Sequence, residues 1–317
     1  MKKPLVILSG PTACGKTALS ISLAKRINAE IISADSMQVY KGFDIGTAKV
    51  TKEEMQGVPH YLIDEMDPDE ECNVFEFQSL AKHYIDEIQN RGKIPMIVGG
   101  TGFYIQSVLY DIDFSQEPAD RSYRHQLEQL AEEKGSPFLH EKLKEIDPDA
   151  AAAIHPNNQK RVIRALEFFH ETGDKISDHN RIQQQTGSPY QFAYFVLNRK
   201  RDVLYDRINQ RVDLMMKDGL VEEVDRLLKE GCKEDYLSMQ GLGYKEIVPY
   251  IHGECSLEEA ADLLKKNTRH FAKRQITWFK REGEIIWINK DDFDYDEDAI
   301  LEYLVMLWRA KERNQKK

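Results

Sequence analysis

The sequence predicts an α/β fold with a doubly wound parallel sheet and an inserted all-helical sub-domain. Short apolar segments typical of buried strands alternate with amphipathic helical segments in both the first and the last third of the chain. The first apolar segment runs directly into a glycine-rich loop and a helix. Residues 119–171, in contrast, are charged and helix-patterned, are interrupted by prolines, and contain no strand candidate.

The first predicted unit is a strand, a phosphate-binding loop and a helix. Leu5 to Leu8 form the apolar strand, and the loop after it fits the pattern G-x-x-x-x-G-K-[ST], so we expect a fold of the P-loop NTPase type. The loop consists of Gly10, Pro11, Thr12, Ala13, Cys14, Gly15, Lys16 and Thr17. Its N–H groups and the helix N-terminus suit an anion, Lys16 suits a phosphate, and the Thr17 hydroxyl is a candidate Mg²⁺ ligand. The sequence therefore predicts a diphosphate or triphosphate site.

The remaining elements follow from the same hydrophobic periodicity. Further strands are expected at residues 29–35, 61–64, 94–98, 191–197 and 284–289. Helices are expected at residues 73–91, 202–217, 220–230, 257–281 and 297–313, and a further helix after Gly102 should carry Ile105, Val108 and Leu109. We expect residues 1–115 and 190–317 to form the catalytic core, and residues 116–189 to form the helical insertion.

Composition limits the class of protein. The chain has 317 residues, of which 41% are hydrophobic and 31% charged, and no apolar run approaches the roughly 18 residues of a membrane span. Met1 leads straight into the first predicted strand, so we expect no signal peptide. The cysteines are scattered singly, so neither a zinc site nor a disulfide framework is expected. We expect a cytoplasmic monomer with no membrane association.

Two predicted strands end at polar residues on what should be one edge of the sheet. Asp35 could hold Mg²⁺, serve as a base or cap a helix, and the sequence leaves these alternatives open. The strand at 94–98 ends in glycines and Thr101 with no carboxylate, which argues against ATP hydrolysis as the main activity. Gln38 suits adenine because its amide can donate and accept together. The run Gly99 to Gly102 is either a tight turn or a place where a substrate approaches the backbone.

A basic segment stands out against the net charge of −10. Between Lys265 and Arg281 there is no acidic residue, and four Lys or Arg side chains recur near helical spacing: Lys266, Arg269, Lys273 and Lys280. A solvated helix face is the alternative, but such a face normally carries compensating carboxylates. We therefore favour contact with nucleic acid. Arg161 and Arg164 form a smaller cationic face in the helical insertion.

Five motifs in order carry a family resemblance: Gly10–Thr17, Ser33–Tyr40, Gly57–Asp64, Val98–Gly102 and Lys273–Trp278. Over nearly its full length the chain resembles bacterial tRNA dimethylallyltransferases, also called tRNA isopentenyltransferases. Cys14 stands where that family often has serine, at a position that acts through its backbone. The C-terminal zinc finger of animal and fungal relatives is absent from this sequence.

The resemblance implies transfer of a dimethylallyl group from dimethylallyl diphosphate to N6 of the tRNA adenosine next to the anticodon on its 3′ side, with release of diphosphate. The loop and Arg211 would then hold diphosphate, rather than the ATP that the motif first suggests. By resemblance Asp35 is the general base, Thr101 orients N6, and Lys16 with Mg²⁺ stabilises the leaving group. The target base would be flipped out of its stack to reach them.

The resemblance also implies a set of residues that contact tRNA. They are Asp35, Ser36, Met37, Gln38, Thr101, Arg124, Gln159, Lys160, Arg161, Val162, Ile163, Arg164, Gly241, Gly243, Tyr244, Lys273, Arg274, Gln275 and Lys280.

Other classes share parts of this pattern. A P-loop small-molecule kinase would use ATP and ignore tRNA, and an adenine-nucleotide isopentenyltransferase would prenylate a free nucleotide. A non-catalytic RNA-binding module would use a nucleotide only as a switch. The basic segment and the helical insertion favour tRNA over the first two, and the pairing of Asp35 with Thr101 argues against the third.

Overall fold

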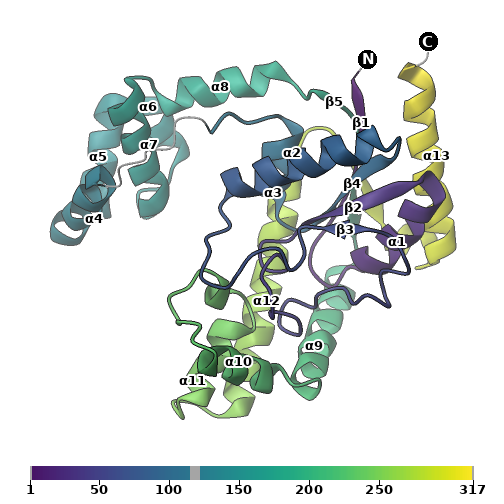
Figure 1. Cartoon of the computed structure of the whole chain (residues 1–317). Coiled ribbons are helices and arrows are strands. Elements are labelled where there is room, and N and C mark those ends of the chain that lie inside the picture. Colours follow the sequence, from purple (N-terminus) through teal and green to yellow (C-terminus); the bar gives the residue numbers. More distant parts are fainter. Residues whose placement is uncertain (1, 115–121, 316–317) are drawn as a thin grey trace. The chain divides into compact units, whose positions relative to one another are not determined.

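The computed structural model describes residues 2–114 and 122–315, and the chain divides into two compact units (Figure 1). The larger unit extends to Val108 and resumes at Tyr190, and the smaller unit is Leu109–Pro189.

The larger unit is built on a parallel sheet of six strands in the order β3-β2-β4-β1-β5-β6. The strands are β1 Lys3–Ser9, β2 Ala29–Ala34, β3 His60–Tyr61, β4 Ile94–Gly99, β5 Tyr190–Asn198 and β6 Ile285–Asn289. Strands distant in sequence lie side by side, because β1 pairs with β4 on one side and β5 on the other. The predicted doubly wound parallel sheet is confirmed.

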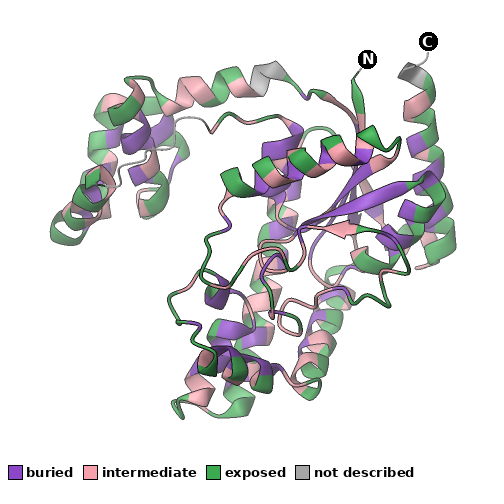
Figure 2. Ribbon diagram, viewed as in Figure 1, coloured by how far each residue is buried: buried purple, intermediate pink, exposed green. Residues whose placement is uncertain are grey.

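Helices cover both faces of this sheet. Along β1, Val6 and Leu8 join a core cluster that includes side chains of α1 (Lys16–Ile27), α9 (Arg201–Lys217) and α13 (Glu297–Gln315). Leu5 and Ile7 alternate with them and are fully buried too, as period-two side-chain alternation requires of a strand covered on both faces. Figure 2 shows the four inner strands β2, β4, β1 and β5 as largely buried ribbons, whereas the edge strands β3 and β6 are mostly half-buried.

Most of the other helices of the larger unit are close to their expected positions: α2 Val74–Asn90, α3 Gly102–Leu109, α10 Leu220–Lys229 and α12 Leu257–Phe279. Helix α11, Tyr244–Ile251, was not expected from the sequence. The Asn73 side chain caps α2 by accepting from the N–H groups of Phe75 and Glu76. Within the two described ranges, no helix is long and apolar enough to cross a membrane.

The edge strand β3 is much shorter than the expected residues 61–64. Leu62 and Asp64 have φ of 60° and 55°, which is left-handed backbone that cannot continue a strand. The pairing with β2 is therefore limited to His60 and Tyr61.

The smaller unit contains only helices in its described residues. They are α4 Ser122–Lys134, α5 Ser136–Ile146, α6 Pro148–Ala153, α7 Gln159–Thr172 and α8 Ile176–Thr186. Apolar side chains of α4 to α7, among them Leu127, Leu143 and Val162, form a core separate from that of the sheet. This unit therefore has its own hydrophobic core.

Candidate active site

The carboxyl edge of the sheet gathers the polar residues. In strand order, Asp35 follows β2, the turn Gly99–Gly102 follows β4, and the phosphate loop follows β1. Arg199 follows β5, and Lys290 follows β6. Parallel strands thus bring together residues that are far apart in sequence, at the edge where α/β proteins bind ligands.

The backbone geometry of the phosphate loop requires its glycines. Gly10 and Gly15 have φ of 143° and 93°. A Cβ on Gly10 would lie 2.5 Å from the Leu197 carbonyl oxygen of the neighbouring strand, so any side chain there would disrupt the sheet edge.

Lys16 is held inside its own loop. Its Nζ donates to the carbonyl oxygens of Gly10 and Pro11, both at 2.9 Å. Burial lowers the pKa of Lys16, and nearby Arg211 lowers it further, against the opposing effects of Cys14 and Asp35. An anion in the loop would favour the charged form of Lys16 and so offset the effects of burial and of Arg211.

Three arginines surround the phosphate loop. Arg199 Nε donates to the Cys14 carbonyl at 3.1 Å, and Arg207 Nε donates to the Ala13 carbonyl at 3.0 Å. Arg211 Nη1 donates to Thr12 Oγ1 at 3.3 Å. Burial lowers the pKa of Arg211, with Asp35 acting in the opposite direction. The loop therefore lies in a strongly cationic setting, although the whole chain is acidic.

Sequence reasoning singled out Arg211 but missed the other two arginines. Arg199 was identifiable in principle, because it follows a predicted parallel strand and so must lie at the same edge as the loop. Arg207 lies one helical turn before Arg211 on α9 and gave no signal of its own. A further basic residue, Lys290, is fully buried and paired with Glu297 at 2.7 Å.

Asp35 presents one oxygen to its own turn and leaves the other open. Oδ1 accepts from the N–H groups of Met37 at 3.0 Å and Gln38 at 3.4 Å. In the described part of the chain no group donates to Oδ2. The turn thus fixes the direction of the carboxylate and leaves one oxygen able to accept a proton.

The Gln38 amide is occupied within the chain. Its Nε2 donates to the carbonyl oxygens of Thr47 and Ala48 at 3.2 and 3.3 Å, and its Oε1 accepts from the Ser33 hydroxyl at 3.4 Å. In this conformation the side chain supports the loop opposite Asp35, and an adenine would have to compete with these bonds.

One cavity of about 280 Å³ connects the phosphate loop with Asp35. Its polar lining includes Thr12, Asp35, Thr101, Arg211 and Arg274. Ser36, Met37 and Gly241 also reach it. Its apolar lining comes from α9, α12 and the loop before α11: Ile208, Val212, Met215, Leu242, Leu264 and Phe271. The cavity therefore combines a cationic end, an open carboxylate and an apolar wall.

The glycine run after β4 makes room for protein rather than for a ligand. A Cβ on Gly99 would lie 2.1 Å from the Ala34 carbonyl oxygen, and one on Gly100 would lie 2.2 Å from Gln275 Nε2. A Cβ on Gly102 would lie 2.2 Å from Trp278 Cδ1. The space that a substrate was expected to use is occupied by β2 and α12.

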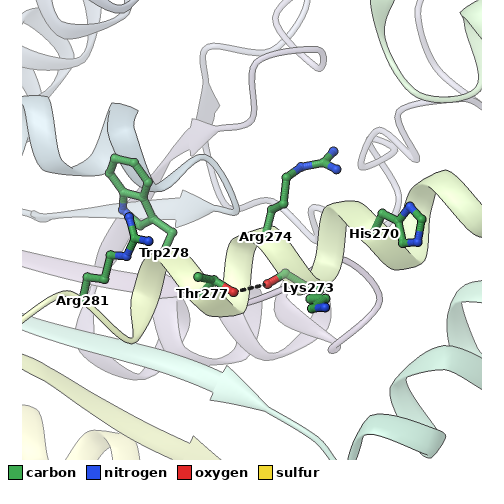
Figure 3. Close-up of a pocket in the computed structure, with 6 residues that line it drawn as sticks. All are labelled: His270, Lys273, Arg274, Thr277, Trp278 and Arg281. Carbon is green, nitrogen blue, oxygen red and sulfur yellow. Dashed lines mark hydrogen bonds between the residues drawn. The ribbon is translucent and has the colours of Figure 1, made fainter. Parts of the chain in front are cut away.

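A second hollow lies along the C-terminal half of α12 (Figure 3). Its volume is about 380 Å³, and its lining consists of His270, Lys273, Arg274, Thr277, Trp278 and Arg281. Figure 3 shows Arg274 and Lys273 extending from different sides of the helix. Trp278 packs edge-on against the exposed ring of Phe103, at 6.0 Å between ring centroids. The hollow thus pairs cations with aromatic surface, the combination that binds nucleic acid strands.

Several of the residues expected to contact tRNA are buried or paired with other residues of the chain. Val162 and Ile163 are buried in the core of the helical unit, and Tyr244 is fully buried in the larger unit. Arg124 donates to the buried carboxylate of Glu167, at 2.8 and 2.6 Å. Among the α7 residues expected to contact tRNA, Lys160 and Arg161 are exposed, and Gln159 and Arg164 are partly exposed.

Glu223 and Tyr244 hold the loop at residues 44–46, of which Gly46 lines the cavity. Glu223, on α10, accepts from the N–H groups of Asp44, Ile45 and Gly46 at 3.1, 2.8 and 3.1 Å. The Tyr244 hydroxyl donates a hydrogen bond to the same carboxylate at 2.7 Å. Gly243 has φ of 100° and begins α11 directly beside Gly46, so this glycine is needed for the turn.

The residues that could ligate a metal ion are few. Across residues 2–114 and 122–315, no group of three or more His, Cys, Asp or Glu could hold a metal ion. Thr17 is exposed at the start of α1, and its hydroxyl makes no hydrogen bond to another described residue. It is therefore available as a ligand for an ion that arrives with a phosphate.

A parallel sheet whose first strand leads into this loop defines an α/β protein of the P-loop class. Within that class, the model of the family described as IPP transferase matches residues 38–282. The chain belongs to this family, which confirms the resemblance read from the motifs.

Individual relatives are similar over most of the chain. A tRNA dimethylallyltransferase of Lachnoclostridium phytofermentans is 60% identical over 305 residues, covering 96% of this chain and 97% of the relative. One of Bacillus subtilis is 54% identical and covers 91% of both chains.

Solved structures are similar as well. The full-length tRNA isopentenylpyrophosphate transferase of Bacillus halodurans has a TM-score of 0.75 and 47% identity, with 100% of both chains covered. A eukaryotic dimethylallyltransferase described as acting on tRNA has a TM-score of 0.79 and 31% identity, covering 90% of this chain and 74% of that one.

Proposed function

We propose that this protein transfers a dimethylallyl group from dimethylallyl diphosphate to N6 of the tRNA adenosine next to the anticodon on its 3′ side. The single observation that carries the proposal is the cavity that joins Thr12 and Arg211 to Asp35 and Thr101 along an apolar wall. The membership in the IPP transferase family, and the names of relatives, support the same reaction.

The donor would bind with its diphosphate in the phosphate loop. Lys16 and Arg211 supply positive charge, and backbone N–H groups of the loop supply directed hydrogen bonds. The five-carbon chain would lie against the apolar wall near Ile208 and Leu264. This orientation places the allylic carbon between the cationic end of the cavity and Asp35.

The reaction exchanges one bond for another. The bond between the allylic carbon and the diphosphate oxygen breaks, the bond from that carbon to N6 forms, and diphosphate leaves with the electron pair. Lys16 and Arg211 stabilise the charge that grows on the leaving oxygen. The open oxygen of Asp35 takes the N6 proton, because an exocyclic amine is a weak nucleophile until that proton departs. Thr101, which lines the same cavity, orients the amine.

A magnesium ion would bind at this site together with the diphosphate of dimethylallyl diphosphate. The exposed Thr17 hydroxyl would hold the ion together with diphosphate oxygens, where the ion adds charge neutralisation to that of Lys16.

The tRNA would reach the cavity with its target base flipped out. Lys273 and Arg274 on α12 and Lys280 directly after it are candidates for phosphate contacts. Lys160, Arg161 and Arg164 on α7 form a second candidate group. Ser36, Met37 and Gly241 line the cavity and would surround the flipped nucleotide.

A direct test incubates the purified protein with labelled dimethylallyl diphosphate, Mg²⁺ and an unmodified tRNA transcript, without ATP. We expect label in tRNA and one equivalent of diphosphate per group transferred. A matched transcript with guanosine in place of the target adenosine should take up no label.

The alternatives predict other results. A small-molecule kinase would consume ATP without labelling tRNA, and a nucleotide prenyltransferase would label free AMP or ATP in preference to tRNA. Either result, or strict dependence on ATP hydrolysis, would overturn the proposal.

A further inference from the structure

Gln275 lies on the basic helix α12, yet only 6% of its surface is exposed. Its side chain reaches inward to two loops of the candidate active site. We propose that Gln275 is a positioning residue that ties the phosphate loop to the turn bearing Thr101, and does not contact tRNA. The inference rests on the proposed function, because it assigns this residue a role in that reaction.

Both ends of the Gln275 amide are used. Oε1 accepts from the Thr12 N–H at 2.9 Å, and Nε2 donates to the Gly100 carbonyl at 3.0 Å. These bonds join residues that follow two neighbouring strands, β1 and β4. A glutamine is one of the few side chains that can donate and accept at once in such a bridge.

The backbone is shaped to admit this side chain. A Cβ at residue 100 would lie 2.2 Å from Gln275 Nε2, so even alanine there would push the amide out. Trp278, one turn later on α12, likewise leaves no room for a side chain at Gly102. The two glycines that flank Thr101 are therefore explained by contacts with α12.

The bridge is part of a longer path of hydrogen bonds. Arg211 donates to Thr12 Oγ1 at 3.3 Å, while the N–H of the same Thr12 bonds to Gln275. On the other side, the Thr101 N–H donates to the carbonyl of Ala34 at 3.2 Å, directly before Asp35. Gln275 thus lies between the groups proposed to bind diphosphate and those proposed to act on N6.

Two sets of side chains on α12 would therefore have different roles, one in binding tRNA and one in positioning the loops of the site. The exposed side chains of α12 face outward where a polyanion can reach them, and Gln275 faces inward. Loss of Gln275 should misplace Thr12 and Thr101 without removing any positive charge from the tRNA surface. A misplacement of about 1 Å at reacting groups is enough to slow a reaction strongly.

The test compares three variants with the parent protein. Gln275→Leu removes both hydrogen bonds, and Gln275→Glu keeps the acceptor for the Thr12 N–H but replaces the donor to Gly100. Gln191→Leu is the matched control, because it removes another glutamine amide, one that donates to the Lys311 carbonyl far from these loops. Binding of inorganic pyrophosphate with Mg²⁺ and binding of tRNA are measured separately by calorimetry.

For Gln275→Leu we expect about tenfold weaker pyrophosphate binding and a lower kcat for prenyl transfer, with tRNA affinity within about twofold of the parent protein. The control should match the parent protein in all three. Weaker tRNA binding with unchanged pyrophosphate affinity would overturn the inference. Gln275 would then contact tRNA, as the family resemblance implies.

A pH series with Gln275→Glu separates positioning from general destabilisation. When protonated, the glutamic acid can donate to the Gly100 carbonyl and accept from the Thr12 N–H, as glutamine does. Burial should raise the pKa of that carboxyl from its ordinary value of about 4.3. Relative to the parent protein, pyrophosphate binding should therefore recover as the pH falls from 8 toward about 5.5, whereas Gln275→Leu should show no recovery. Equal pH profiles for the two variants would contradict the inference.

The outcomes also separate this inference from the proposed function. If the parent protein neither binds pyrophosphate nor labels tRNA, the proposed function fails. If it does both and Gln275→Leu changes neither, the inference alone fails.

Discussion

At the scale of single residues, the charged side chains divide into those that face the site and those that hold the fold together. Lys16 lies in the phosphate loop and Arg211 beside it, and burial lowers the pKa of both by disfavouring their charged forms, which an anion bound there would favour. Arg124, which the family resemblance predicts to contact tRNA, also pairs with Glu167, whose side chain is only 1% exposed. Sequence alone cannot separate these cases, because an arginine looks the same whether its partner is a phosphate or a buried carboxylate.

Arg124→Ala should therefore destabilise the helical unit. Removing one partner of a buried ion pair leaves an uncompensated charge and costs about 3 to 5 kcal/mol, and the partial exposure of Arg124 places the expected cost near the lower limit. Hydrogen exchange in α4 and α7 should increase markedly. Arg181→Ala, which breaks an exposed pair with Asp178 on α8, is the control and should change exchange little. Unchanged protection in α7 would show that the Arg124–Glu167 pair does not stabilise the unit.

At the scale of elements, local patterns predicted most strands and helices but not the contacts between them. Asn73 and the capping box at Ser256 mark the starts of α2 and α12, and both act over three or four residues. The strand β3 is shorter than the sequence predicted, because Leu62 and Asp64 adopt left-handed backbone that their residue types do not signal. The bonds of Glu223 to the loop at 44–46 join residues nearly 180 positions apart, so no local pattern could reveal them.

The exposed side of α12 should carry a salt-dependent share of tRNA binding. Lys273→Ala and Lys280→Ala should each weaken tRNA binding and reduce the slope of log K against log salt by about one unit at most. Affinity for dimethylallyl diphosphate should not change. Lys3→Ala is the control, because Lys3 pairs with Asp86 and begins β1, at the opposite end from the phosphate loop. An unchanged salt slope in the double variant would make this side of α12 an ordinary solvated surface.

The edge strand β3 should make stability depend on pH. Burial lowers the pKa of His60 below 6.5, and its Nδ1 lies 2.8 Å from the Val58 carbonyl oxygen. A lowered pKa means that the unfolded chain binds the proton more readily, so the contribution of neutral His60 is present above pH 6.5 and is lost as the pH falls through the lowered pKa. Urea unfolding between pH 7.5 and 5 should show a smaller loss of stability in His60→Gln than in the parent protein. An identical pH dependence would rule out this role for His60.

At the scale of the whole molecule, the net charge of −10 conceals two cationic regions that serve different partners in the proposed reaction. One surrounds the phosphate loop at the sheet edge, and the other covers the outward side of α12. The parallel sheet joins them, because its strand order brings the ends of β2, β4 and β1 together and α12 packs on the turn after β4. The motifs predicted which loops meet. The cavity between them depends on packing that only the structure supplies.

The most direct test of this account asks whether Asp35 takes the N6 proton in the cavity that the phosphate loop serves. Single-turnover prenyl transfer and equilibrium binding of dimethylallyl diphosphate are measured across a Mg²⁺ titration for Asp35→Asn and Lys16→Ala. Asp35→Asn should slow the chemical step by about 10² to 10⁴ while donor affinity and Mg²⁺ dependence stay nearly unchanged, because only the proton acceptor is lost. Lys16→Ala should weaken donor binding as well as turnover. If Asp35→Asn instead shifts the Mg²⁺ dependence or abolishes donor binding, Asp35 belongs to the metal and diphosphate site, and its assignment as the base is wrong.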